Sequence, residues 1–157
     1  MKYNTLLFMG LASIILGIIG LVLLNLGDIN LDVSNGSAVE RGAWIFNTGT
    51  DPNGQPIPFS GGMMMEASCA GCHGTNGHGL HTPMFTSPNI TYRNLTDSAG
   101  MIEPDGRHGM TYTDELILRA VTQGIDAEGK PLDSFMPHWQ LTNAEWNALL
   151  AYLKAMP

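Results

Sequence analysis

The stretch Ser68–His81, "SCAGCHGTNGHGLH", contains both cysteines of the chain and three of its five histidines. On a helix, Cys69, Cys72 and His73 lie at positions i, i+3 and i+4, so two thiols and one imidazole project from the same face. Gly74 follows at once and lets the chain leave the helix with no side chain in the way. This spacing is typical of c-type haem attachment, in which the thiols bond to the haem vinyl groups and the histidine ligates iron. The stretch therefore predicts one covalently bound haem c.

Two other uses of the cysteines fit the spacing less well. A zinc site could be written with Cys69, Cys72, His78 and His81, but five residues separate the two pairs and two separate the histidines. Finger-like zinc sites need about 12 to 15 and three to five residues there. A thioredoxin-like redox pair would need a strand and a βαβ unit, which the sequence lacks. We expect His78, His81 and His108 to be polar residues of surface loops.

The second axial position of the iron requires a ligand from elsewhere, and Met136 in "DSFMPHWQL" is the best candidate. Pro137 stops helix formation and stiffens this loop, and the aromatic side chains of Phe135 and Trp139 flank the methionine. A methionine ligand raises the reduction potential and blocks small ligands. The predicted iron ligands are therefore His73 and Met136.

Other residues remain as alternatives for that position. His138 is the main rival and would give bis-histidine coordination with a lower potential. Met84, Met101 and Met110 lie in a long loop and are weaker candidates. Met63, Met64 and Met65 precede the attachment motif, where core packing is the expected role.

Three segments away from the motif carry helix signals. Ala38–Asn47, "AVERGAWIFN", places its apolar residues at helical spacing. Thr113 can cap a helix with an acidic first turn that ends at Gly124. Thr142, with Glu145 three residues later, forms a capping box for the last helix, whose apolar residues also repeat at helical spacing.

A fourth helix is expected over Met63–His73. The intervening segments Thr48–Gly62 and Gly74–Thr111 are rich in Gly, Pro, Asn and Thr and are predicted to be loops. A compact domain rarely holds so long a loop as the second without a reason, and wrapping around a large cofactor would be one. No run alternates like a strand between turn signals. The predicted fold class is all-α, a transmembrane helix followed by a domain with long haem-wrapping loops.

The N-terminal segment Leu6–Leu26, "LLFMGLASIILGIIGLVLLNL", contains no charged residue. As a helix it would extend about 30 Å, the thickness of a bilayer's hydrocarbon core. The alternative is a secretory signal peptide, but its apolar region is usually about 7 to 15 residues and ends in a small-residue cleavage site that is not evident here. We therefore expect an uncleaved anchor. Lys2 before it, and Asp28 and Asp32 after it, place the N-terminus in the cytoplasm.

These signals divide the chain into an anchor at residues 1–27, a polar linker at 28–37 and a single domain at 38–157. The domain is then expected on the periplasmic side of the inner membrane. The formal charge of the chain is −7, which repels a phosphate backbone and argues against nucleic acid as a partner. Two cysteines in a chain of 157 residues also exclude a disulfide framework.

The order of the motifs carries a resemblance to a known family. "CAGCHG" at 69–74 is followed by a long loop, then by "MP" at 136–137 and by a last helix ending in "LLAYLKAMP". Together they resemble the class I cytochrome c family, over Ala38–Pro157. The resemblance implies a single-haem electron carrier that makes or breaks no substrate bond.

The resemblance also implies particular contacts. Gly42 and Phe46 of the first helix would cross Tyr152 of the last. A proline carbonyl would accept a hydrogen bond from the ligand histidine and fix its orientation; Pro88 in "SPNITY" is the first choice and Pro83 the second. The chain departs from the family at Thr48–Gly62, a segment longer than usual, which is either a docking insertion or a tolerated loop.

Further likeness concerns "SPNITYRNLTDSAG" and "GMTYTDELILRAVTQGIDAEGKPL", which look like cytochrome subunits of membrane respiratory and dehydrogenase assemblies. This implies protein electron donors and acceptors, among them other subunits of a respiratory or photosynthetic complex of the quinol-oxidising or alternative complex III type. The acidic exterior favours a partner with a basic docking face. Two other functions stay open: a haem enzyme or gas sensor with an open sixth site, and an assembly role in which the haem is secondary.

Overall fold

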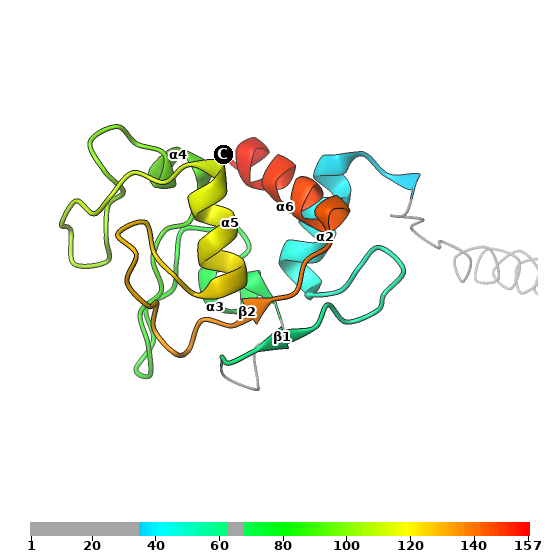
Figure 1. Ribbon diagram of the computed structural model, residues 1–157, viewed down its shortest axis with the longest axis horizontal. Coiled ribbons are helices and arrows are strands. Elements are labelled where there is room, and N and C mark those ends of the chain that lie inside the picture. The colour runs from blue at the N-terminus through cyan, green and yellow to red at the C-terminus, as the bar shows by residue number, and fades with distance from the viewer. Residues whose placement is uncertain (1–34, 63–67) are drawn as a thin grey trace, which may run out of the picture. The chain divides into compact units, whose positions relative to one another are not determined.

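The computed structural model describes residues 35–62 and 68–157, which belong to one compact unit, Val33–Pro157. The predicted anchor at Leu6–Leu26 and the methionines at 63–65 lie outside the described residues. Within the described ranges no helix is both long and apolar enough to cross a membrane. The elements in chain order, labelled in Figure 1, are α2 (Ala38–Thr48), β1 (Phe59–Ser60), α3 (Cys69–His73), α4 (Tyr92–Leu95), α5 (Asp114–Gln123), β2 (His138–Trp139) and α6 (Asn143–Ala155).

The first and last of these helices, α2 and α6, cross in close contact. A Cβ atom added at Gly42 would lie 2.0 Å from the carbonyl oxygen of Ala148 and 2.7 Å from Cβ of Tyr152, so only glycine fits at the crossing. One turn later, the rings of Phe46 and Tyr152 lie 5.3 Å apart between centroids. These are the contacts that the resemblance implied.

Side-chain caps set the ends of the longer helices. Ser37 and Glu40 form a capping box at the start of α2, and Thr142 and Glu145 form one at the start of α6. Thr113 caps α5 through the backbone N–H of Leu116. The starts of α5 and α6 that Thr113 and Thr142 predicted are confirmed, because capping depends on a few residues close in sequence. The start of α2 at Ala38, predicted from apolar spacing, is confirmed as well.

The helix predicted at Met63–His73 is wrong in its extent. Ser68 has extended backbone angles, and its side chain accepts a hydrogen bond from the N–H of Gly71, so it is the N-cap of α3. A helix therefore begins at Cys69 and does not run through Ser68. The short helix α4 also lies within a predicted loop, where Thr91 caps it.

A small antiparallel strand pair corrects the expectation of an all-α domain without strands. Phe59 of β1 pairs with Trp139 of β2, and Ser60 pairs with His138. The two rings of the first pair lie 5.0 Å apart. Strands of two residues are too short to show alternation in the sequence, so this pairing could not be predicted. The domain is otherwise helical with long loops.

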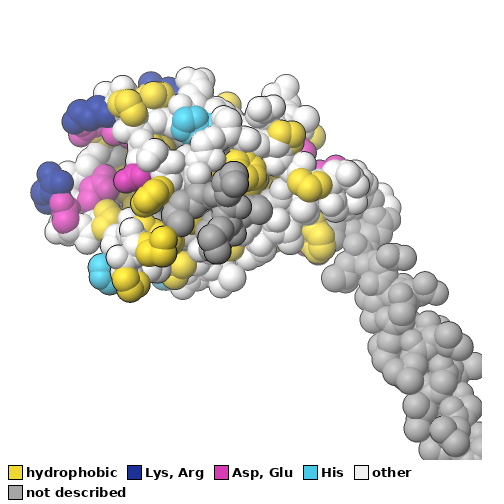
Figure 2. Space-filling view, turned by 90° about the horizontal axis from the view of Figure 1, so that it is seen from below, with side chains coloured by type: hydrophobic (Ala, Val, Ile, Leu, Met, Phe, Trp, Pro, Cys, Tyr) yellow, Lys and Arg dark blue, Asp and Glu magenta, His cyan; other side chains and the backbone are white. Residues whose placement is uncertain are grey.

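Three loops of the domain share one local structure. Residues 50–56, 102–108 and 125–131 each close on themselves through an isolated β-bridge between their first and last residues. In each, an acidic residue at the second position donates its N–H to the carbonyl four residues later, over 2.7 to 2.8 Å. Figure 2 shows charged side chains gathered at the end of the molecule where the latter two loops lie.

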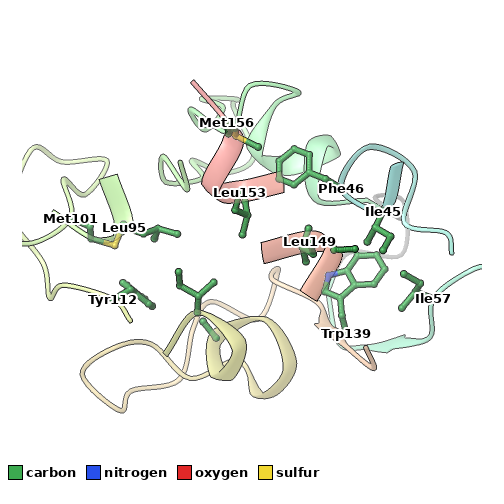
Figure 3. Packing of buried hydrophobic residues seen from close by; sticks show 13 residues of the cluster. Ile45, Phe46, Ile57, Leu95, Met101, Tyr112, Trp139, Leu149, Leu153 and Met156 are labelled. Atoms are coloured by element: carbon green, nitrogen blue, oxygen red, sulfur yellow. The ribbon is translucent and has the colours of Figure 1, made fainter. Parts of the chain in front are cut away.

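The buried hydrophobic residues form one core cluster, shown in Figure 3. In this view Leu95, Met101 and Tyr112 lie on one side of Leu153, and Trp139 and Leu149 lie on the other. The members of the core are Ile45, Phe46, Ile57, Leu95, Met101, Tyr112, Ile117, Ala120, Trp139, Ala148, Leu149, Leu153 and Met156.

Candidate haem site

A cavity of about 280 Å³ opens beside α3 and is lined mostly by apolar side chains. Cys72 and His73 line it from α3, and Met136 and Pro137 line it from the loop before β2. Of the core residues, Leu95, Met101, Tyr112, Ile117, Ala120 and Leu153 line it, whereas Trp139 and Leu149 do not. Its apolar lining includes Phe85, Ile90, Leu95, Met101, Ile117, Val121, Leu132, Phe135 and Leu153. A cavity of this composition suits a large, mostly apolar ligand.

The His73 side chain is buried in this wall, with 5 % of the residue exposed. Its Nδ1 lies 3.0 Å from the carbonyl oxygen of Pro88. Burial lowers the pKa of the imidazole, and the hydrogen bond to Pro88 raises it by a smaller effect. A neutral imidazole that donates from Nδ1 keeps a lone pair on Nε2, which is the atom available to bind a metal.

The segment that carries Pro88 packs closely on α3. The hydroxyl of Ser87 donates to the carbonyl of Cys72, and the N–H of Leu80 donates to that hydroxyl over 2.8 Å. A Cβ at Gly79 would lie 2.3 Å from the carbonyl oxygen of Ser87 and 2.9 Å from that of Pro88. The roles of Ser87 and Gly79 could not be predicted from the sequence, since they depend on neighbours distant in the chain. Pro83, the second choice, is exposed and does not line the cavity.

The two cysteines lie one turn apart on α3, with Cys72 at the cavity wall. Burial raises the pKa of the Cys69 thiol to about 12. A thioredoxin-like pair needs a thiol with a lowered pKa, so the dithiol interpretation lacks support here.

The contacts of His78 and His81 do not support a zinc site either. Nδ1 of His78 lies 3.4 Å from the side-chain nitrogen of Asn76, and that of His81 lies 2.6 Å from the hydroxyl of Thr86. Across residues 35–62 and 68–157, no group of three or more His, Cys, Asp or Glu side chains is placed to hold a metal ion. His78 and His81 are exposed loop residues, as the sequence predicted.

The candidates for the second axial ligand differ in whether they line the cavity. The imidazole of His138 packs against Gly124, where a Cβ would lie 1.9 Å from Nε2, and His138 does not line the cavity. Met110 is 52 % exposed and is also absent from the wall. Among the residues that the structure describes, the methionines that line it are Met84, Met101 and Met136. Met84 is 69 % exposed and Met101 is part of the core.

Met136 sits in a tight turn. Its N–H donates to the carbonyl of Asp133 over 2.9 Å, and the N–H of Phe135 donates to the Asp133 carboxylate over 2.9 Å. The residues around the cavity thus fit a c-type haem: two thiols for the vinyl groups, a buried imidazole held by a carbonyl, a thioether in a turn, and apolar walls.

A comparison with known families agrees with this geometry. The family model of cytochrome c matches residues 60–157, more than half of the chain. The chain therefore belongs to the cytochrome c family, and its cofactor is haem c, bound covalently through the Cys69, Cys72 and His73 motif. Comparisons with curated proteins and with solved structures found no match. The matched region begins within β1, so α2 lies before it.

Proposed function

We propose that this protein is a membrane-tethered one-electron carrier with His73 and Met136 as the axial ligands of its haem iron. Membership of the cytochrome c family supports an electron carrier, not a catalytic enzyme. When bound, the haem supplies an iron that cycles between ferrous and ferric states. The rest of the function depends on how the chain's own residues hold it.

The observation that carries the proposal is that His73 and Met136 line one apolar cavity from different elements. The hydrogen bond to Pro88 orients His73 and makes the imidazole a stronger electron donor. Met136 supplies a thioether, a ligand that favours the ferrous state. The apolar wall keeps water from the site, which also favours the less charged ferrous form.

The axial assignment is tested by the absorption of the ferric protein. Thioether ligation gives a sulfur-to-iron charge-transfer band, which should be present in the wild type and absent in Met136→Ala. Met84→Ala serves as the matched control, because Met84 also lines the cavity but is largely exposed. If Met84→Ala lost the band and Met136→Ala kept it, the ligand would be Met84 and not Met136. Ready binding of carbon monoxide by the reduced wild type would instead favour a haem enzyme or gas sensor.

The proposal includes the location. The uncharged run Leu6–Leu26 would anchor the chain in the inner membrane with its N-terminus in the cytoplasm and the haem domain in the periplasm. The electron donor and acceptor would then be proteins of that compartment, among them other subunits of a membrane complex of the quinol-oxidising or alternative complex III type. Fractionation of cells that express the full chain or a chain lacking residues 1–27 tests this. The full chain should sediment with membranes and the shortened chain should not.

A further inference from the structure

The segment 57–62, expected from the sequence to be part of a surface loop, packs along the loop that carries Met136. Gln140 donates its N–H to the carbonyl of Pro58 over 2.8 Å, and β1 pairs with β2 immediately beside it. On the other side of Met136, Gly62 donates its N–H to the carbonyl of Ser134 over 3.1 Å. The Met136 turn is therefore fixed to one segment at both of its ends.

Gly62 also touches the residue after the methionine. A Cβ at Gly62 would lie 2.9 Å from Cβ and 3.1 Å from Cα of Pro137, whose ring cannot rotate out of the way. The φ angle of Gly62 is +76°, in the region that favours glycine. Both the close approach and the backbone angle restrict this position to glycine.

The segment is itself anchored in the core. Ile57 is 3 % exposed and donates its N–H to the carbonyl of Gly49 over 2.9 Å. Phe59 packs its ring on Trp139, which is 4 % exposed. The segment that contacts the Met136 turn is thus held in place by buried residues.

We infer that residues 57–62 form a strap that positions Met136 toward the iron, an inference that rests on the proposed His73 and Met136 ligation. A methionine side chain has three rotatable bonds, so a turn held at one end only would leave its sulfur distributed over many positions. Fixing Ser134 and Pro137 on either side removes most of that freedom before the sulfur meets the iron. The strap residues touch Met136's neighbours and act through them, so they are positioning residues.

Two adjacent glycines provide a matched test. Gly61 and Gly62 both have positive φ angles, +69° and +76°, but a Cβ at Gly61 would have no atom within 4 Å. Gly61→Ala therefore introduces backbone strain alone, whereas Gly62→Ala adds a collision with Pro137. The haem-loaded ferric proteins are compared by the sulfur-to-iron band and by titration with imidazole, a ligand that competes with the methionine.

We expect Gly62→Ala to weaken the band and to bind imidazole about tenfold more tightly than the wild type. Imidazole must displace the methionine, so a loss of about 1.4 kcal/mol in the binding of Met136 to iron would give this tenfold change. Gly61→Ala should stay within about twofold of the wild type. Phe59→Leu, which loses the ring contact with Trp139, should shift in the same direction as Gly62→Ala, and Ser60→Ala on the exposed side of β1 should not. Tyr152→Leu, a change at the α2 and α6 crossing, controls for a general loss of stability.

The outcomes separate the inference from the proposed function. If Met136→Ala abolishes the band while Gly62→Ala and Phe59→Leu behave like their controls, the strap is overturned and the ligation stands. If Tyr152→Leu tightens imidazole binding as much as Gly62→Ala, the effect is one of stability and the strap is again overturned. If the wild type shows no such band, the ligation fails and the strap fails with it.

Discussion

The imidazole of His73 and the carbonyl of Pro88 form a hydrogen bond between residues fifteen positions apart in the chain. It joins the attachment helix to the loop that follows it, and Gly79 makes the approach possible by presenting no side chain to Ser87 and Pro88. The orientation of His73 therefore depends on a glycine that does not itself line the cavity.

Gly79→Ala is expected to displace the Pro88 carbonyl and to raise the reduction potential, since a histidine that loses this hydrogen bond is a weaker donor to ferric iron. Potentiometric titration of the holoprotein measures the shift. Gly106→Ala is the control, because Gly106 has a similar φ angle of +82° and no atom within 4 Å of its Cβ position. Equal potentials in the two variants would contradict the role given to Gly79.

The crossing of α2 and α6 predicts a large loss of stability for Gly42→Ala. Its Cβ would overlap the backbone of Ala148, and overpacking of this kind costs about 1 to 3 kcal/mol or more. Urea unfolding of the holoprotein, followed by circular dichroism, gives the free energy of unfolding. Val39→Ala, on an exposed part of the same helix, should change it little. A stable Gly42→Ala variant would mean that the helices can separate without loss.

Acid should weaken the contact between α5 and the end of α6. Lys154 donates to the Asp114 carboxylate over 2.6 Å, and Tyr92 donates to it over 2.9 Å. Both hydrogen bonds lower the pKa of Asp114, and the one from Lys154 has the larger effect. A carboxyl group with a lowered folded-state pKa stabilises the protein above its unfolded-state pKa, and that contribution disappears as the pH falls through the folded-state value.

Asp114→Asn should therefore lower Tm at pH 7 and bring the Tm values at pH 7 and pH 3 closer together than in the wild type. The effect should be small, because the groups are partly exposed and water screens them. Glu128→Gln removes a carboxylate from the exposed pair with Lys130 and should affect Tm less. If Tm depended on pH equally in Asp114→Asn and the wild type, Asp114 would not contribute to the loss of stability in acid.

Covalent attachment should depend on each cysteine separately. Each thiol forms one bond to a vinyl group, so Cys69→Ser and Cys72→Ser are each expected to retain haem through one bond, and the double variant should release it into acidified acetone. The reduced pyridine spectrum counts the remaining vinyl groups. Ser68→Ala changes the cap of α3 but neither thiol, and should keep both bonds. Retention of haem by the double variant would contradict the attachment.

Features that depend on residues close in sequence could be predicted, whereas most contacts between residues distant in sequence could not. The starts of α5 and α6 follow from caps that the sequence shows directly, the start of α2 follows from apolar residues at helical spacing, and the attachment motif follows from spacing within one turn. The hydrogen bond to Pro88 was expected only through the family resemblance. The pairing of Phe59 with Trp139 was not expected, because two-residue strands 80 positions apart leave no periodic pattern. Likewise, only the fold shows that His138 packs on Gly124 and so lies outside the cavity wall.

The glycine at the α2 and α6 crossing also bears on how the cavity opens. Because α2 precedes both cysteines and α6 follows the Met136 turn, the contact at Gly42 joins the two segments that flank the whole haem-binding part of the chain. Leu153 of α6 lines the cavity. Separation of the two helices should therefore remove Leu153 from the wall and expose the haem to solvent, so that local opening at the crossing becomes a route to haem exposure without complete unfolding.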